Sequence, residues 1–337
     1  MTKKIGMISL GCPKNQVDAE IMLSRLEKNG FEIVNDPVEA DIVIVNTCGF
    51  IEDAKRESIE NILDMISYKE DYPLLKVLVT GCLAQRYQSE IFSEIPETDG
   101  VIGIGANEDI CEICEKIING EKIERFPEKT NLKIEGDRIL TSPPYSAYIK
   151  IAEGCSNHCT YCAIPSIRGE YRSRPSENIL AEAKKLAGQG VKELVVVAQD
   201  TTRYGEDLYG KNALVPLLKA MSQIDGIEWI RLLYLYPERI DDALIDEIAS
   251  NGKIVKYMDI PLQHCNARIL KRMNRHGDRE FLTNLINKIR DRIKDVTIRT
   301  TFIAGFPGET EEEARETLEF VEKARFARIH VFPYSRR

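Results

Sequence analysis

The first part of the chain alternates short apolar runs with segments of helical periodicity. Three of these runs read "IGMISL", "DIVIVN" and "KVLVT", and each is followed by a stretch with helical spacing of its apolar residues. Strands that alternate with helices in this way are typical of an α/β layer with parallel strands. We therefore predict an open parallel-sheet α/β domain over residues 1–120.

A change in this pattern marks the expected domain boundary. Between Gly120 and Ser146 the sequence is polar and aperiodic, and Pro143 and Pro144 interrupt any regular element. We assign residues 121–146 to a linker. The segment 147–337 then contains six apolar runs separated by helical patterns: "AYIKIAEG", "ELVVVAQD", "IEWIRLLYLYP", "KYMDIPLQ", "TIRTTFIAGFPG" and "RIHVFPYS". These repeats predict a partial (βα)6 barrel with its chemistry at the carboxyl ends of the strands.

Three cysteines stand where strands of the first domain should end. Cys12, Cys48 and Cys82 each follow an apolar run at a similar offset, and their spacing is close to one strand-helix-strand unit. The carboxyl ends of parallel strands lie along one edge of a sheet, so these three thiols should converge there. The alternative is that they are small hydrophobic core residues, which is common for cysteine.

A second set of three cysteines begins directly after the first expected barrel strand. Cys155, Cys159 and Cys162 form a C-x3-C-x2-C loop, which suits thiolate ligation of an iron–sulfur cluster or zinc. Structural zinc needs a fourth ligand, and His158 is adjacent to Cys159, where both side chains can rarely reach one ion. The spacing therefore favours an iron–sulfur cluster with one iron left open.

Composition narrows the possible partners and the compartment. The 337 residues carry a net charge of −8 with a pI near 5.4, so a broad electrostatic footprint for nucleic acid is missing. A short basic run, Arg168, Arg172 and Arg174, is more typical of a solvated face. The start of the chain lacks a signal-like pattern, and no window is apolar enough for a membrane helix, so we expect a cytoplasmic protein with reduced thiols.

The remaining cysteines and histidines show no ligand spacing. Cys111 and Cys114 lie among isoleucines on an expected helix and Cys265 stands alone, so we interpret all three as core residues. His264, His276 and His330 receive no role. In "GFPGETEEEA", Thr310 and Glu313 fit a capping box at a helix start.

The C-x3-C-x2-C loop on a parallel barrel resembles the radical S-adenosylmethionine superfamily. Together with "SLGCPKNQVDAE", the strand-end cysteines and "GCSNHCTYCAIPSIRGEYRSR", it resembles the methylthiotransferases across nearly the whole chain. This resemblance implies two 4Fe-4S clusters, one held by each cysteine set, and S-adenosylmethionine bound at the open iron of the barrel cluster. The one-electron cleavage of that cofactor would yield a 5'-deoxyadenosyl radical. The cofactor pocket would be lined by Tyr161, Gln199, Asp200, Gln263, Thr301 and Gly305.

The residues of these motifs are similar to those of one branch of that family. "GCPKN" and "CTYCAIPSIRG" resemble the branch that methylthiolates the β-carbon of an aspartate in ribosomal small-subunit protein S-twelve. This implies that protein as partner, with an electron donor such as flavodoxin or ferredoxin. The alternatives are a tRNA adenosine methylthiotransferase and a non-catalytic iron–sulfur electron carrier. Family members normally continue into a small substrate-gripping β-barrel domain, which we expect to be absent because the sequence ends directly after the sixth apolar run.

Overall fold

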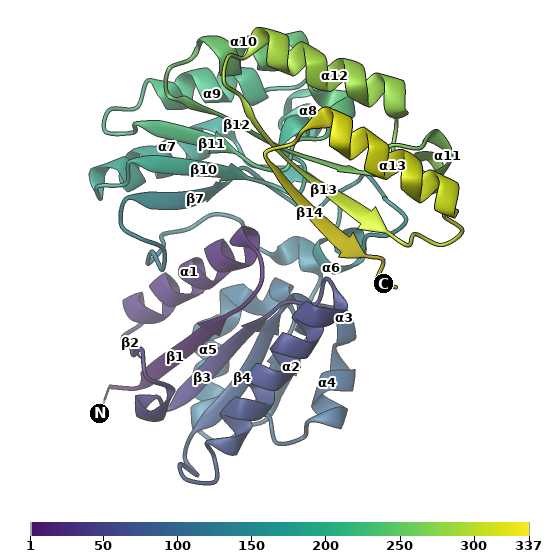
Figure 1. Cartoon of the computed structure of the whole chain (residues 1–337). Helices are drawn as coiled ribbons and strands as arrows, with labels where there is room; N and C mark the ends of the chain where they lie inside the picture. Colours follow the sequence, from purple (N-terminus) through teal and green to yellow (C-terminus); the bar gives the residue numbers. More distant parts are fainter. Residues whose placement is uncertain (1, 337) are drawn as a thin grey trace. The chain divides into compact units, whose positions relative to one another are not determined.

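The computed structural model describes residues 2–336, which form two compact units (Figure 1). The N-terminal unit comprises the chain up to Thr141 together with the later segment Ala163–Gly169. The barrel unit comprises Ser142–Cys162 and the chain from Glu170 to Arg336. A short piece of chain from the middle of the sequence therefore belongs to the N-terminal unit.

The N-terminal unit is built on a parallel six-stranded sheet with the strand order β2-β1-β3-β4-β5-β6. Its strands are β1 (Lys4–Ser9), β2 (Glu32–Ile33), β3 (Ile42–Thr47), β4 (Lys76–Gly81), β5 (Gly100–Ile102) and β6 (Ile123–Arg125). Its α-helices are α1 (Pro13–Lys28), α2 (Glu52–Ser67), α3 (Cys82–Tyr87), α4 (Ser89–Glu94), α5 (Ile110–Ile118) and α6 (Ile164–Arg168), with 3-10 turns η1 (Pro37–Glu39), η2 (Ile104–Asp109) and η3 (Lys129–Asn131).

Strand alternation explains why helices cover both faces of this sheet. On β3, Ile42 and Ile44 pack with residues of α1 and α5, whereas Val43 and Val45 pack with residues of α2, α3 and α4. Successive strand residues point to opposite faces, and a strand with four consecutive apolar residues, as in β3, must be buried on both. The predicted open parallel-sheet domain is thus confirmed.

The edge strand β6 lies inside the segment that the sequence analysis assigned to a linker. Its residues pair with β5 in parallel, from Gly100 opposite Ile123 to Ile102 opposite Arg125. Only three residues take part, and just one of them is apolar, so no periodic signal could distinguish this strand from the polar segment around it. The segment 121–146 therefore contributes to the first sheet before the chain leaves it.

The barrel unit contains a second parallel six-stranded sheet, in the order β14-β13-β12-β11-β10-β7 (Figure 1). Its strands are β7 (Ser146–Lys150), β10 (Glu193–Val197), β11 (Trp229–Leu232), β12 (Ile254–Gln263), β13 (Thr297–Ala304) and β14 (Arg328–Pro333), and a separate antiparallel pair joins β8 (Ala152–Glu153) to β9 (Arg172–Ser173). Its helices are α7 (Ser176–Gly188), α8 (Glu206–Tyr209), α9 (Leu214–Ser222), α10 (Asp242–Ser250), α11 (Ala267–Arg272), α12 (Arg279–Arg292) and α13 (Glu311–Ala324), with 3-10 turns η4 (Thr201–Arg203) and η5 (Pro237–Arg239).

The strand order follows the chain order, as a partial (βα)6 barrel requires. Each strand pairs in parallel with the next along the sequence, and the edge strands β7 and β14 each have one partner in the order. This confirms the predicted fold class. The predicted capping box is also present at α13, where the Thr310 hydroxyl accepts from the Glu313 amide and the Glu313 carboxylate accepts from the Thr310 amide.

Among residues 2–336, no helix is both long enough and apolar enough to cross a bilayer.

Candidate functional site

The three N-terminal cysteines lie at neighbouring strand ends, as the strand-end rule predicts. Cys12 immediately precedes α1, Cys48 immediately follows β3, and Cys82 is the first residue of α3, directly after β4. The sheet register pairs Ser9 with Asn46 and Asn46 with Thr80, so the strands end level with one another. The charge of Cys12 acts on Cys48, and the charges of Cys12 and Cys48 act on Cys82, as expected for thiols that lie close together.

Local structure distinguishes the three thiols electrostatically. Burial raises the pKa of the Cys48 thiol, and it raises the pKa of Cys82 to about 12. Burial acts on Cys12 as well, but there the positive charges of Lys14 and Arg168 and the backbone amides of the first turn of α1 outweigh it, so its pKa is lowered. A thiolate at a helix N-terminus beside cations is the more reactive and better-ligating form.

Arg168 contributes to this three-thiol site from the segment Ala163–Gly169. Its side chain is fully buried, with Nε 3.4 Å from the Cys82 Sγ and Nη1 2.9 Å from a carboxylate oxygen of Asp18. Its Nη2 donates to the Asn15 Oδ1 at 3.2 Å. The interpretation of the basic run as a solvated face is wrong for Arg168 and Arg174, since Arg174 is 2% exposed and donates to the Lys150 carbonyl.

Two asparagines that the sequence analysis did not single out complete the surroundings of these thiols. The Asn15 side chain donates to the Leu10 carbonyl at 2.7 Å, and the Asn46 side chain donates to the Asn15 carbonyl at 3.0 Å. Within the described part of the chain the buried Asn46 Oδ1 has no hydrogen-bond partner. An unpaired buried oxygen is costly, which is typical of a site that binds a further group. No local sequence signal marks these residues except their position beside a strand end.

The C-x3-C-x2-C loop of the barrel unit is held from several sides. The buried Glu153 accepts from the Gly154 amide at 3.0 Å and from the Lys150 ammonium at 2.7 Å, directly before Cys155. Asn274 donates to the carbonyls of Asn157 and His158, at 3.1 Å each. These contacts fix a loop that regular secondary structure does not hold.

The three thiols of this loop also affect one another. Cys155 and Cys159 are buried and Cys162 is partly exposed. Burial first, and the neighbouring charges of Cys162, Asp200 and Cys159 after it, raise the pKa of Cys155 to about 12. The Cys159 Sγ lies 3.2 Å from the Tyr236 hydroxyl. His158 is exposed and takes a left-handed backbone conformation (φ 50°), which agrees with its exclusion as a fourth ligand.

Both sets of thiols consist of potential metal ligands. Across residues 2–336, no group of three or more His, Cys, Asp or Glu side chains already has the arrangement needed to hold a metal ion. The chemistry of the donors nevertheless fits one class of group. Two sets of three thiols without an accompanying histidine or carboxylate ligand suit an iron–sulfur cluster with an open iron.

The residues expected to bind the cofactor stand at the carboxyl ends of β10, β12 and β13. Gln199 follows β10, and its buried Nε2 has no hydrogen-bond partner within residues 2–336, which is typical of a group that binds a ligand. Gln263 ends β12 with φ 73°, a strained conformation for a residue with a side chain. Thr301 lies within β13, and a Cβ at Gly305 just beyond it would meet open space.

Asp200 and Tyr161 instead make contacts within the protein. Asp200 is fully buried and accepts from the Asn157 side chain at 2.8 Å, so it anchors the C-x3-C-x2-C loop. Burial raises its pKa, although Thr202, Asn157 and Arg239 oppose this. The Tyr161 hydroxyl accepts from Arg275, whose guanidinium stacks 4.1 Å from the Tyr236 ring centroid. Both residues therefore shape the site around the thiol loop.

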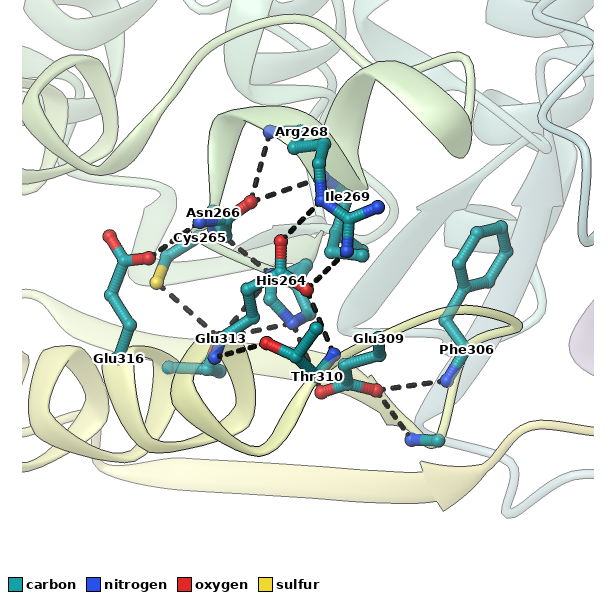
Figure 2. Close-up of polar contacts among 12 residues, drawn as sticks. His264, Cys265, Asn266, Arg268, Ile269, Phe306, Glu309, Thr310, Glu313 and Glu316 are labelled. Atoms are coloured by element: carbon teal, nitrogen blue, oxygen red, sulfur yellow. Dashed lines mark hydrogen bonds and ion pairs between the residues drawn. The ribbon is translucent and has the colours of Figure 1, made fainter.

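A buried polar cluster that the sequence analysis missed joins the ends of β12 and β13 (Figure 2). His264, which directly follows Gln263, lies 3.2 Å from Glu309, and its Nδ1 accepts from the Asn266 amide at 3.0 Å. The other carboxylate oxygen of Glu309 accepts from the amides of Gly305 and Phe306 at 2.7 and 2.9 Å. The only available signal was the position of His264 beside an expected cofactor residue. Cys265 and Cys114 are buried as predicted, whereas Cys111 is partly exposed.

Comparison with known proteins shows which families this chain is similar to. Residues 149–321 match the family described as the radical SAM superfamily, and residues 4–103 match the uncharacterized protein family UPF0004. In solved structures, the chain is similar to the radical S-adenosylmethionine methyltransferase TsrM from Kitasatospora setae with cobalamin and a 4Fe-4S cluster bound. That similarity has a TM-score of 0.67 at 15% identity and covers 99% of this chain and 75% of TsrM. At such low identity it shows the fold alone.

Sequence relatives are much more similar. The ribosomal protein uS12 methylthiotransferase RimO from Thermoanaerobacter sp. (strain X514) is 53% identical over 99% of this chain and 76% of its own length. The enzyme of the same name from Acetivibrio thermocellus is 51% identical over 100% of this chain and 76% of its own length. The fold and the cysteine loop are thus those of a radical SAM enzyme. Within that superfamily, the chain belongs to the RimO family of methylthiotransferases.

Proposed function

We propose that this protein methylthiolates the β-carbon of an aspartate in uS12, the ribosomal small-subunit protein S-twelve, and that it uses two 4Fe-4S clusters and S-adenosylmethionine. In the overall change, a C–H bond of the aspartate is replaced by a C–S bond, and the sulfur carries a methyl group from S-adenosylmethionine. The observation that carries this proposal is the presence of two separate sets of three thiols, each at the carboxyl edge of a parallel sheet.

The barrel unit would hold one cluster through Cys155, Cys159 and Cys162. When bound there, such a cluster supplies an electron and an open iron position for the amino and carboxylate groups of S-adenosylmethionine. The chain's own residues orient these parts. Glu153 holds the start of the thiol loop at Gly154, Asp200 holds Asn157 between the first two cysteines, and the unpaired Gln199 Nε2 offers a donor toward the cofactor.

The N-terminal unit would hold the second cluster through Cys12, Cys48 and Cys82. Support comes from their position at neighbouring strand ends, from the burial of Cys48 and Cys82 and from the lowered pKa of Cys12. A core role would not require the three thiols to gather at one edge, nor a buried arginine against one of them. In a methylthiotransferase, a second cluster accounts for the source of the transferred sulfur.

The substrate assignment rests on relatives of about 50% identity, such as the three from Thermoanaerobacter, Acetivibrio and Lachnoclostridium, which are named for uS12. The net charge of −8 supports a protein substrate over a nucleic acid, because it offers no broad cationic surface for phosphates. The proposal includes a cytoplasmic location, where ribosomes and reduced thiols are found, and an electron donor such as flavodoxin or ferredoxin.

The test has two arms. First, iron and acid-labile sulfide are counted after anaerobic reconstitution of the protein and of its Cys12→Ala/Cys48→Ala/Cys82→Ala variant. We expect about eight irons per chain falling to about four, as two cubane clusters require. About four irons per chain in both proteins would refute the second cluster. Second, a form that also carries the substrate-gripping domain of the family, with both clusters intact, is incubated with uS12, reductant and S-adenosylmethionine, and the masses of the uS12 peptides are measured. Absence of a methylthio gain on uS12, with 5'-deoxyadenosine formed, would refute the substrate.

A further inference from the structure

We propose that Arg168 is a positioning residue for the N-terminal cluster, and that its charge and its hydrogen bond to Cys82 raise the reduction potential of that cluster. This inference rests on the proposed function, because it requires Cys12, Cys48 and Cys82 to hold a cluster. It concerns a residue that the sequence places beside the barrel cysteines and that the structure places in the other unit.

The contacts of the Arg168 guanidinium point to this role. Its Nε faces the Cys82 Sγ at 3.4 Å, while Nη1 and Nη2 reach Asp18 at 2.9 Å and Asn15 at 3.2 Å. The planar guanidinium presents its donors in a fixed fork, so Asp18 and Asn15 determine where Nε points. The arginine is therefore held with one donor directed at a sulfur that would be a cluster ligand.

Burial makes this contact energetically significant. Arg168 is 0% exposed, and its partner Asp18 is 2% exposed. A buried ion pair costs much desolvation and is weak as a general stabilising device. Its position next to a thiol points to a functional role, in which the cation offsets the negative charge of three thiolates in a region of low dielectric.

The segment that carries Arg168 is anchored in the N-terminal unit. Ile167 is fully buried and packs in one apolar cluster with Cys82 and Ala163. Lys129 donates to the Ser166 carbonyl at 2.5 Å and to the Pro165 carbonyl at 3.3 Å. Helix α6 ends at Arg168, and Gly169 follows it with a φ of 80°, which suits a glycine. Arg168 thus enters the site from a fixed backbone rather than from a loose loop.

The expected effect on the cluster follows from charge and hydrogen bonding. Reduction adds a negative charge to the cluster, and a nearby cation and a donor to a ligand sulfur both stabilise the reduced form. Loss of the arginine should therefore favour the oxidised form and shift the potential to more negative values. A tenfold change in the ratio of the two forms corresponds to a shift of about 59 mV for a one-electron couple.

The experiment isolates the N-terminal cluster by placing Arg168→Gln and Arg168→Lys in the full chain with Cys155→Ala/Cys159→Ala/Cys162→Ala. Iron is counted after anaerobic reconstitution, and the reduction potential is measured by titration with EPR detection. The matched control is Arg172→Gln, because Arg172 belongs to the same basic run but lies in the barrel unit. We expect about four irons in the parent. In Arg168→Gln the potential should become more negative by an amount that corresponds to about a tenfold or larger change in the ratio of the two forms. The change should be smaller in Arg168→Lys and absent in the control.

Failure of the inference and failure of the proposed function give different results. If the parent with intact Arg168 binds no iron, the N-terminal cluster itself is refuted. If Arg168→Gln binds iron normally at an unchanged potential, Arg168 has no role and the proposed function stands. Loss of iron in Arg168→Gln with unchanged melting of the apoprotein supports the positioning role. If that variant unfolds, Arg168→Lys decides, and an unchanged potential there overturns the inference.

Discussion

The buried His264 side chain lies 3.2 Å from a carboxylate oxygen of Glu309 and so connects the end of β12 to the loop after β13 (Figure 2). The remaining Glu309 oxygen binds the amides of Gly305 and Phe306. We expect Glu309→Gln to weaken S-adenosylmethionine binding by about tenfold, because hydrogen bonds to a charged acceptor contribute roughly 1.5–3 kcal/mol. Calorimetric titration of the reconstituted protein measures this. Glu311→Gln, which alters an exposed carboxylate on α13, is the control, and equal affinities in both variants would contradict the expectation.

Asp200→Asn should increase the stability of the apoprotein at neutral pH while reducing cofactor binding. Burial raises the pKa of Asp200 in the folded state, so ionisation above the unfolded pKa of about 3.9 disfavours folding. The variant should gain stability relative to the parent as pH rises from the unfolded pKa of about 3.9 to the raised folded pKa. Above the folded pKa the difference should stay constant. Urea unfolding at pH 4 and pH 7 checks this. A variant that is less stable by the same amount at both pH values would show that the carboxylate is needed for packing.

Gly81→Ala should unfold or severely destabilise the N-terminal unit. At Gly81, φ is 94°, and a Cβ would lie 2.5 Å from the backbone N and O of Thr47. Thr47 is the residue of β3 that pairs with Gly81 in the sheet. Gly120 has the same φ of 94° with nothing within 4 Å of its Cβ position. Gly120→Ala should therefore cost about 1 kcal/mol for conformation alone, and Gly81→Ala more than about 3 kcal/mol. Thermal unfolding of both variants compares them, and similar melting temperatures would exclude the clash.

Thr310→Ala should lower the free energy of unfolding by about 1 kcal/mol through loss of the capping box at α13. Thr283→Ala is the matched control, since the Thr283 hydroxyl donates to the Arg279 carbonyl inside a helix and caps nothing. Denaturant titrations give both values. A larger loss in the control than in Thr310→Ala would argue against the cap as the stabilising feature.

Much of the fold could be predicted because it depends on short-range periodicity. The strands β1, β3 and β4 each contain a short run rich in apolar residues, so both the strands and the edge at which their cysteines gather follow from chain order. Arg168 could not be found in this way. An arginine in a basic run has the same local pattern whether it is solvated or buried, and its partners Asp18 and Asn15 lie far away in the sequence.

The same limit applies to the polar cluster around His264. Its main partner, Glu309, is 45 residues away, and no periodic pattern relates the two positions. The cofactor residues proposed at strand ends came from resemblance to a family, and the structure adds which of them are already engaged. Asp200 and Tyr161 already form hydrogen bonds within the protein, whereas Gln199 has an unpaired buried nitrogen in the described part of the chain.

The insertion of Ala163–Gly169 into the N-terminal unit has a consequence for inheritance. A recombination event at the apparent boundary near residue 141 would transfer the first sheet without α6, Ile167 and Arg168. The exchanged sheet would then meet a foreign α6, whose arginine and isoleucine had been selected against different neighbours. The two halves of this gene should therefore pass from lineage to lineage together, although each has its own sheet and its own core.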